Sequence, residues 1–292
     1  TPKPSSAASD VYKRQGTPLI YKAIPTWFVN VEKIRERMVE LNKETHWVPG
    51  FIGEKRFSNW LGNARDWAIS RNRYWGSCIP VWINIDDPDD KLCIGSVEEL
   101  KNLTGKEITD LHRHYLDDLI IEKEGKTYKR TSEVLDCWFE SGAMPYGQQH
   151  YPFENEELFK QGFPADFIAE GLDQTRGWFY TLTVLAVALF DSVAFKNCIT
   201  TGMILAEDGR KMSKSLKNYP DPEELLNEYG GDSLRAYLID SPVVRGEPLK
   251  FSEEGVKLVT RNIILPLWNS YSFFSTYANA DEITNEDLMK AL

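Results

Sequence analysis

The sequence has 292 residues, 42% of them hydrophobic and 27% charged, which is an ordinary globular composition in a chain long enough for two folding units. Its 34 basic and 44 acidic residues leave a formal net charge of −10, the wrong sign for a protein that binds nucleic acid over its whole surface. The longest apolar run, from Trp178 to Phe190, has 13 residues, and a bilayer span needs about 20. We therefore expect a soluble protein with a buried helix there.

Four cysteines stand at positions 78, 93, 137 and 198, and none of them forms a CxxC pair. We interpret them as reduced thiols of a cytoplasmic protein. His112 and His114 are the only close histidines, and on a strand they would point to opposite faces. We therefore predict no metal site.

The first part of the chain contains few strong patterns. Residues 1–16 are interpreted as an unstructured leader, since no pattern connects them with the rest of the chain. Residues 79–85 predict a strand that ends at the Asp-rich turn 86–90, and residues 95–130 mix helix and loop patterns without chemistry that we can name. Before them, a helix after Pro25 is predicted from apolar residues that share one face: Val31, Ile34, Met38 and Leu41.

A strand–helix–strand pattern occupies the middle of the chain. Residues 165–169 predict a short buried strand, residues 177–190 an apolar helix, and residues 197–205 the next strand. Such a βαβ unit requires a parallel sheet. Ligands of these sheets bind at the carboxyl ends of the strands, where Glu170 and the loop 206–217 lie in the sequence.

Helices are predicted for the rest of the chain. Residues 222–229 form one helix that Gly230-Gly231 ends, and Asp232 is the predicted cap of the next helix, 233–239. A long amphipathic helix with a kink at Pro266 comes next. Its apolar positions are Val256, Val259, Ile263, Leu267, Tyr271, Phe274 and Tyr277.

The strongest chemical signal is the stretch Lys211-Met212-Ser213-Lys214-Ser215, which comes directly after Asp208-Gly209-Arg210. Two lysines spaced by three, with hydroxyl residues near them, suit a loop that holds phosphates through ammonium charge and hydrogen-bond donors. A solvated basic loop is the alternative.

A second constellation runs from Glu170 to Phe179 with the sequence EGLDQTRGWF. Two acids and an amide at a strand end, with glycines on both sides, allow close approach of a ligand and supply several acceptors. The alternative is structural, with Asp173 as a helix N-cap and Trp178 in the core.

Two further stretches combine aromatic and charged residues. Residues 136–142, DCWFESG, contain Trp138, which is either a pocket wall or an ordinary core tryptophan. Residues 66–76, DWAISRNRYWG, contain Arg71 and Arg73. These arginines could face a ligand, and a structural role is an equal alternative.

Together the four stretches resemble signatures of the class I aminoacyl-tRNA synthetases, with residues 211–215 similar to the KMSKS motif. The resemblance implies that Lys214 is the key contact to the triphosphate of ATP and that Lys211 assists it as a second catalytic residue. It also implies which of the remaining residues contact the nucleotide and which contact the amino acid. ATP and adenylate contacts come from Met212, Ser213, Ser215, Asp173 and Gln174, and the aminoacyl group lies among Glu170, Gly171, Trp138 and Trp178, the two tryptophans facing each other.

Within this family the chain resembles the isoleucine type, of the eukaryotic cytoplasmic branch. The similarity is carried by residues 17–21, 27–29, 141–146 and 214–220. It implies ATP and Mg²⁺ as cofactors, isoleucine and tRNA(Ile) as partners, and a cytoplasmic location. Association with other synthetases in a complex is left open.

The implied fold is α/β: the second half of a Rossmann-like class I synthetase catalytic domain, followed by the start of an α-helical anticodon-binding domain. After the leader 1–16, the expected divisions are the end of an editing insertion at 17–60, the catalytic half at 61–200, the KMSKS loop with its adjoining helices at 201–255, and the first anticodon-domain helix at 256–292.

The family also needs an H-x-G-H motif, and none of the four histidines, at 46, 112, 114 and 150, begins one. We therefore expect this chain to be a fragment with little adenylation activity alone. The alternatives are a valine- or leucine-type synthetase and a non-catalytic tRNA-binding fragment. An unrelated P-loop enzyme is excluded, since no G-x-x-x-x-G-K-[ST] motif occurs.

Overall fold

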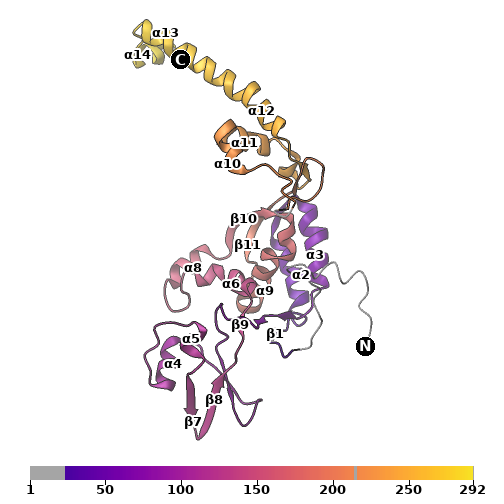
Figure 1. Ribbon diagram of the computed structural model, residues 1–292, viewed down its shortest axis with the longest axis vertical. Coiled ribbons are helices and arrows are strands. Elements are labelled where there is room, and N and C mark those ends of the chain that lie inside the picture. The colour runs from indigo at the N-terminus through magenta and orange to yellow at the C-terminus, as the bar shows by residue number, and fades with distance from the viewer. Residues whose placement is uncertain (1–23, 214–215, 292) are drawn as a thin grey trace. The chain divides into compact units, whose positions relative to one another are not determined.

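The computed structural model describes residues 24–213 and 216–291, and it separates into two compact units. The first unit contains residues 24–31 and Arg65–Glu140, and the second contains Glu32–Ala64 and the chain from Ser141 onward. Figure 1 shows the labelled elements of both units along the colour scale. Among the described helices, none combines the length and the apolar character that a bilayer crossing requires.

The first unit is built on antiparallel pairing. A four-stranded sheet has the order β6-β5-β8-β7, and two smaller pairs join β1 to β3 and β4 to β9. The strands are β1 (Phe28–Val29), β3 (Trp67–Ala68), β4 (Ser70–Arg71), β5 (Val81–Asn84), β6 (Lys91–Cys93), β7 (Ile120–Lys123), β8 (Lys126–Arg130) and β9 (Val134–Leu135). The helices are α4 (Val97–Thr104), α5 (Arg113–Leu116) and α6 (Cys137–Gly142), whose last residues belong to the second unit.

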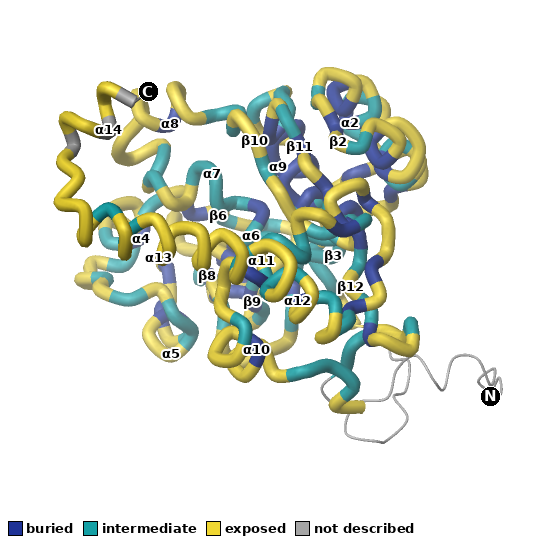
Figure 2. Tube along the Cα trace, turned by 90° about the horizontal axis from the view of Figure 1, so that it is seen from above, coloured by how far each residue is buried: buried dark blue, intermediate teal, exposed yellow. Residues whose placement is uncertain are grey.

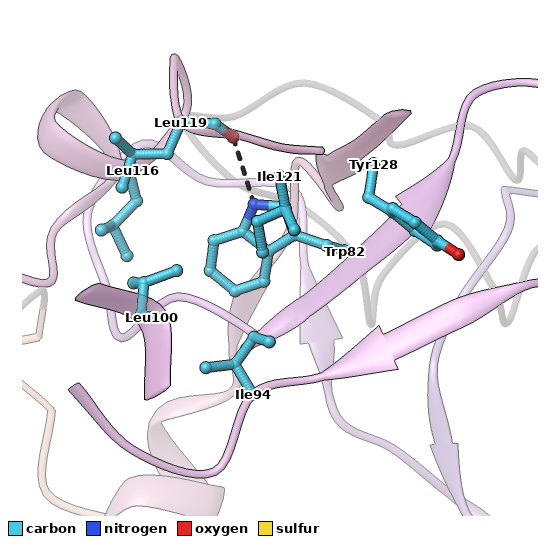
Figure 3. Packing of buried hydrophobic residues seen from close by; sticks show 7 residues of the cluster. All are labelled: Trp82, Ile94, Leu100, Leu116, Leu119, Ile121 and Tyr128. Atoms are coloured by element: carbon cyan, nitrogen blue, oxygen red, sulfur yellow. Dashed lines mark hydrogen bonds between the residues drawn. The ribbon is translucent and has the colours of Figure 1, made fainter. Parts of the chain in front are cut away.

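One hydrophobic cluster forms the core of this sheet, and Trp82 lies within it (Figure 3). Its indole is 1% exposed, and the indole N–H donates to the carbonyl of Leu119 at 3.1 Å. A buried tryptophan needs such a partner, because an unpaired N–H in an apolar core is costly. The other members of the cluster are Ile94, Leu100, Leu116, Leu119, Ile121 and Tyr128.

The structure extends and corrects the expectations for this unit. The predicted strand 79–85 is present as β5, but β7 and β8 were not predicted from the charged segment 95–130. Their hairpin turns at Glu124 and Gly125, whose φ angles of 54° and 73° suit a tight hairpin. The close histidines lie at a helix start, with His112 as the N-cap of α5 and His114 inside that helix.

The second unit contains a three-stranded parallel sheet with the order β10-β11-β2. The prediction of a βαβ unit is confirmed, because β10 and β11 run parallel and α9 connects them. The elements around this sheet are α2 (Arg35–Leu41), η1 (Asn42–Glu44), β2 (His46–Val48), η2 (Ile52–Phe57), α3 (Ser58–Gly62), α7 (Met144–Gly147), α8 (Glu156–Gly162), β10 (Ala165–Gly171), η3 (Leu172–Arg176), α9 (Trp178–Phe190) and β11 (Phe195–Thr201).

The two faces of the parallel sheet differ in burial. Register places Cys198 beside Trp47, and both are buried, with the Trp47 ring 4.9 Å from Phe57 and 5.8 Å from Phe179. The α9 and η2 side chains therefore cover this face, and Figure 2 colours most of α9 as buried. The opposite face presents Phe167 and Ile199, which are 63% and 39% exposed.

A smaller lobe of the second unit comes after the sheet. The predicted strand 197–205 is in fact two strands, because the chain leaves the sheet at Gly202, whose N–H donates to the carbonyl of Val243 at 2.8 Å. A Cβ at Gly202 would collide with the backbone of Glu247, so the close approach requires glycine. The elements of the lobe are β12 (Ile204–Leu205), α10 (Pro222–Tyr229), α11 (Gly231–Ile239), η4 (Pro242–Arg245) and β13 (Leu249–Lys250), with β12 parallel to β13.

The predicted helices are present with one change at a cap. The helix 222–229 has the predicted bounds, but α11 begins at Gly231 and its N-cap is Gly230, so Asp232 lies in the first turn and the prediction of an Asp232 cap was wrong. The long C-terminal helix is built from α12 (Glu253–Val259), a π-helical turn η5 (Thr260–Ile264) and α13 (Leu265–Ala280), followed by α14 (Asn285–Ala291). The π-helical turn lies directly before Pro266, where we predicted a kink. The side chains of α13 are mostly exposed (Figure 2).

Candidate functional site

The carboxyl end of β10 carries the first residues of the candidate site. Glu170 pairs with Thr200 of β11, and Gly171 pairs with Thr201. Both strands run in the same direction, so both end at this edge of the sheet. Glu170 is exposed there, while the neighbouring Thr200 is buried and its hydroxyl donates to the carbonyl of Val48 at 3.2 Å. This edge of the sheet therefore presents an exposed carboxylate beside a buried threonine.

The turn after β10 brings the acidic and amide groups of the motif together. The Asp173 carboxylate lies over Gly171 so closely that a Cβ on Gly171 would stand 2.6 Å from Oδ1. Gln174 donates to Asp173 Oδ2 at 3.2 Å and accepts from the Trp178 backbone N–H at 3.0 Å. The alternative of Asp173 as a helix N-cap is wrong, because Gln174 bonds the first amide of α9 and Gly177 occupies the cap position.

Thr175 and Arg56, to which the sequence analysis assigned no role, support this turn. Thr175 is fully buried, its hydroxyl donates to the Leu172 carbonyl at 2.8 Å, and it accepts from Arg56 Nε at 3.1 Å. The Arg176 guanidinium lies 4.9 Å from the ring centre of Trp60. No local pattern could have identified Arg56, because it is 119 residues from Thr175 in the chain.

Trp178 is half-buried at the start of α9, so it is not an ordinary core tryptophan. Its indole N–H donates to the carbonyl of Ser141 at 2.9 Å. That bond holds one edge of the ring, and a rigid aromatic surface is what an apolar ligand pocket requires.

The KMSKS-like loop begins with a tight hairpin. The Ala206 N–H donates to the Arg210 carbonyl at 2.9 Å, and Gly209, with φ of 83°, donates to the Ala206 carbonyl at 2.8 Å. Asp208 accepts from the backbone N–H and from Nε of Arg210 at 2.9 and 2.7 Å, and these bonds lower the pKa of the Asp208 carboxyl. The hairpin places the exposed Lys211 at its end.

The described part of this loop ends at Ser213, and Lys214 and Ser215 lie outside the described residues. Met212 is half-buried and packs against the cluster of Leu225, Phe251 and Val256. A cavity of about 280 Å³ beside the loop is lined by Glu207, Met212, Asn218, Tyr219, Phe251 and Glu253 among others. The loop therefore has one apolar anchor and a polar hollow next to it.

The first unit contains its own cavity, of about 480 Å³, at the DCWFESG segment. Trp138 is 41% exposed and lines it, together with Arg71, Arg73, Trp75 and His112. The prediction that Trp138 faces Trp178 joins residues of different units and stays a prediction.

Arg71 has a structural role in this cavity. Its Nη2 lies 2.7 Å from the buried carboxylate of Asp136, and its Nη1 donates to the carbonyls of Ala68 and Ser70. The guanidinium is thus held at the cavity wall by β4 and by the residue that precedes α6. The same geometry leaves the sequence alternatives for Arg73 open.

An aromatic stack at the same cavity was not predicted. The His112 ring stacks on Trp75 with centroids 4.2 Å apart, and its Nδ1 lies 2.6 Å from Asp110 Oδ1. The backbone N–H of His112 also donates to Asp110, and this bond is the main reason that the pKa of the Asp110 carboxyl is lowered. Among residues 24–213 and 216–291, no group of three or more His, Cys, Asp or Glu side chains is arranged to hold a metal ion.

Comparison with solved structures supports the same α/β core. Mycobacterium tuberculosis methionyl-tRNA synthetase, solved in complex with methionyl-adenylate, matches with a TM-score of 0.55 and 19% identity, over 86% of this chain and 40% of that chain. At this identity the likeness concerns the fold alone.

Sequence comparison is much closer. An isoleucine–tRNA ligase from Protochlamydia amoebophila is 62% identical over 91% of this chain, and the cytoplasmic isoleucine–tRNA ligase of Caenorhabditis elegans is 58% identical over 92%. The chain spans about a quarter of the length of these curated relatives, at 25% and 24%. The family model for class I tRNA synthetases (I, L, M and V) matches residues 2–250. The chain therefore belongs to the class I tRNA synthetases of the I, L, M and V group.

Proposed function

We propose that this chain is part of an isoleucine–tRNA ligase, which activates isoleucine with ATP and transfers it to tRNA(Ile). The observation that carries the proposal is the identity of 58–62% to proteins of that name over more than nine tenths of the chain. The arrangement of the second unit supports it, because the acidic end of β10 lies beside β11, and the lysine-bearing loop follows the short strand β12 that comes shortly after β11. A cytoplasmic location, as in the name of the nematode relative, is part of the proposal.

In the proposed reaction, a carboxylate oxygen of isoleucine attacks the α-phosphorus of ATP and pyrophosphate leaves. Negative charge grows on the phosphoryl oxygens, so preorganised cations stabilise the transition state more than the ground state. We assign this task to Lys214, with Lys211 assisting. Met212, Ser213 and Ser215 position the loop against the phosphates. A hydroxyl of the terminal ribose of the tRNA then attacks the aminoacyl carbonyl carbon, and AMP leaves.

The resemblance to the synthetase signatures assigns roles to the remaining site residues. Glu170 and Gly171 stand at the strand end and hold the aminoacyl moiety, while Asp173 and Gln174 contact the ribose and adenylate from the turn. Trp178, held by its bond to Ser141, forms one apolar wall for the branched side chain. Trp138 is assigned the second wall, in the cavity that Arg73 also lines.

Mg²⁺ enters the proposal through the nucleotide. This ion usually keeps several waters and binds substrate phosphates together with one or two carboxylates. We assign it no side-chain ligand, and every residue role above stands without one.

Amino-acid-dependent ATP–pyrophosphate exchange by the longer protein that carries this segment tests the proposal. Isoleucine is expected to support exchange best. Preferential exchange with valine or leucine would assign the alternative type, and binding of tRNA without any exchange would favour the non-catalytic module. The 292-residue chain alone is expected to show little exchange, and robust activity in that chain would contradict its proposed status as a fragment.

Substitution of the central lysine tests the catalytic assignment. Lys214→Ala in the longer protein is expected to lower the exchange rate by roughly 10²–10³-fold, the usual cost of losing one preorganised contact to transition-state charge. Lys257→Ala is the matched control, because Lys257 is exposed on α12. Equal rates in the two variants would refute the loop assignment.

A further inference from the structure

The side chain of Asn218 connects two parts of the KMSKS-like loop that are separated in the sequence. Its Oδ1 accepts from the backbone N–H of Ser213 at 2.9 Å. Its Nδ2 donates to the backbone carbonyl of Lys211 at 3.2 Å. One half-buried carboxamide thus bonds residues five and seven positions earlier, on both sides of Met212.

Backbone bonds also connect Ser213 with the residues just before Asn218. The Ser213 carbonyl accepts from the N–H groups of Leu216 and Lys217 at 3.1 and 2.9 Å. Lys217 has a φ of 48°, in the left-handed region. These bonds hold Asn218 close to Ser213, within reach of the backbone that its side chain bonds.

Three independent contacts therefore restrain the start of the loop. The hairpin with its Asp208 bonds holds the entry, Met212 packs on the apolar cluster of the lobe, and Asn218 bonds the backbone on either side of Met212. Of these three, Asn218 is the one that bonds the backbone of Lys211 directly. Lys214 comes one residue after the bonded amide of Ser213.

We propose that Asn218 is a positioning residue for catalysis, holding the backbone of Lys211 and Ser213 in the signature. This inference rests on the proposed function, since it assigns the lysines a task on the triphosphate. The physical reason is preorganisation: a cation acts best when it is already placed where charge develops, and a displacement of about 1 Å can cost roughly 10²-fold in rate.

The chemistry of the carboxamide gives the proposal a specific signature. Asn218 uses one acceptor atom and one donor atom at the same time, and aspartate has no donor when ionised. In Asn218→Asp, one oxygen can still accept from Ser213, but the other oxygen would face the Lys211 carbonyl oxygen. Replacing the carboxamide by a carboxylate therefore removes one hydrogen bond and adds a repulsion without changing the size of the side chain.

The kinetic test compares Asn218→Asp with Asn227→Asp in the longer protein. Asn227 is exposed on α10 and gives the same change in charge near the lobe. We expect Asn218→Asp to lower kcat of ATP–pyrophosphate exchange by about 10²-fold while KM for isoleucine changes less than about twofold. The control is expected to retain the wild-type rate. The proposal would be overturned if kcat did not change, or if KM for isoleucine rose by the same factor as kcat fell.

A structural test needs no activity. In the 292-residue chain, hydrogen exchange of the Ser213 amide is expected to accelerate by about tenfold or more in Asn218→Ala, which removes its acceptor, with the secondary structure retained by circular dichroism. In Asn218→Asp the Ser213 amide keeps an acceptor, so a smaller loss of protection is expected there. Protection that persists in Asn218→Ala would overturn the proposal.

The two tests also separate this inference from the proposed function. If the longer wild-type protein shows no isoleucine-dependent exchange, the proposed function fails and the catalytic role of Asn218 fails with it. If wild-type exchange is robust while Asn218→Asp keeps its rate and Asn218→Ala keeps the protection of the Ser213 amide, the proposed function stands and the positioning role alone is wrong.

Discussion

The two main sheets of this protein differ in how far their faces are covered. The antiparallel sheet β6-β5-β8-β7 packs one face on α4 and α5 around Trp82, and an antiparallel sheet tolerates water on its other face. The parallel sheet β10-β11-β2 buries Trp47 and Cys198 on one face, yet its other face exposes apolar side chains. Parallel sheets are ordinarily covered on both faces. The comparison shows that the antiparallel sheet has an apolar cluster covered by its helices, whereas the parallel sheet retains uncovered apolar area among the described residues.

The largest effect is expected in the antiparallel core. Trp82→Ala removes a side chain that is 1% exposed, and such truncations cost about 3–5 kcal/mol of unfolding free energy. Urea unfolding followed through hydrogen exchange of residues 81–130 measures the loss. Trp268→Ala is the matched control, because Trp268 is 61% exposed on α13, and it is expected to change stability by less than about 0.5 kcal/mol. Similar losses of unfolding free energy in both variants would contradict the assignment of Trp82 to the buried core.

A pH-dependent effect is expected at the hairpin tips of the same sheet. Asp90 accepts from Lys126 Nζ at 2.8 Å, from Asn84 Nδ2 at 3.0 Å and from the Tyr128 hydroxyl at 2.9 Å. These bonds, that of Lys126 first, lower the pKa of Asp90 to about 2.

Because the pKa of Asp90 is lower in the folded state than its ordinary value of about 3.9, the carboxylate stabilises the fold fully above about pH 4. This stabilisation is lost as the pH falls toward 2. Thermal unfolding of the wild type and of Asp90→Asn is therefore expected to differ at neutral pH and to converge near pH 2. A difference in melting temperature that is independent of pH would contradict this role.

The smallest effect is expected on the exposed face of the parallel sheet. Phe167 is 63% exposed, so Phe167→Ser is expected to change the free energy of unfolding by about 0.5 kcal/mol or less. Phe179→Ser, on the covered side, is expected to cost several times more, because Phe179 is fully buried. Comparable losses in urea unfolding would show that the Phe167 face is covered in solution and would remove the contrast between the two faces.

Much of the second unit was predictable because its patterns are local. The apolar run that became α9 and the strand that became β10 stand out by composition, and Pro222 with Gly230 marks both ends of α10. Hydrophobic periodicity and helix-end residues act over a few positions, so they can be recognised without neighbours. The same holds for the KMSKS-like stretch, whose residues are consecutive.

The missed elements depended on neighbours distant in the sequence. The strands β7 and β8 carry many charges. Their residues Ile121 and Tyr128 can be recognised as core residues only from their packing in one cluster with Trp82. The division of the predicted strand 197–205 at Gly202 depends on Val243, and the supporting contact of Arg56 depends on Thr175. Such pairings have no signal in a local window.

The sequence by itself determined the chemical groups of the candidate site and their order, because the lysines, acids and tryptophans form short consecutive motifs. Tertiary structure alone decided which of these groups are held and by what. Thr175 accepts from Arg56, Trp178 donates to Ser141, and Asp136 holds Arg71. The physical reason is that a hydrogen bond needs its two groups within about 3 Å, and folding rather than spacing along the chain brings distant groups to that distance.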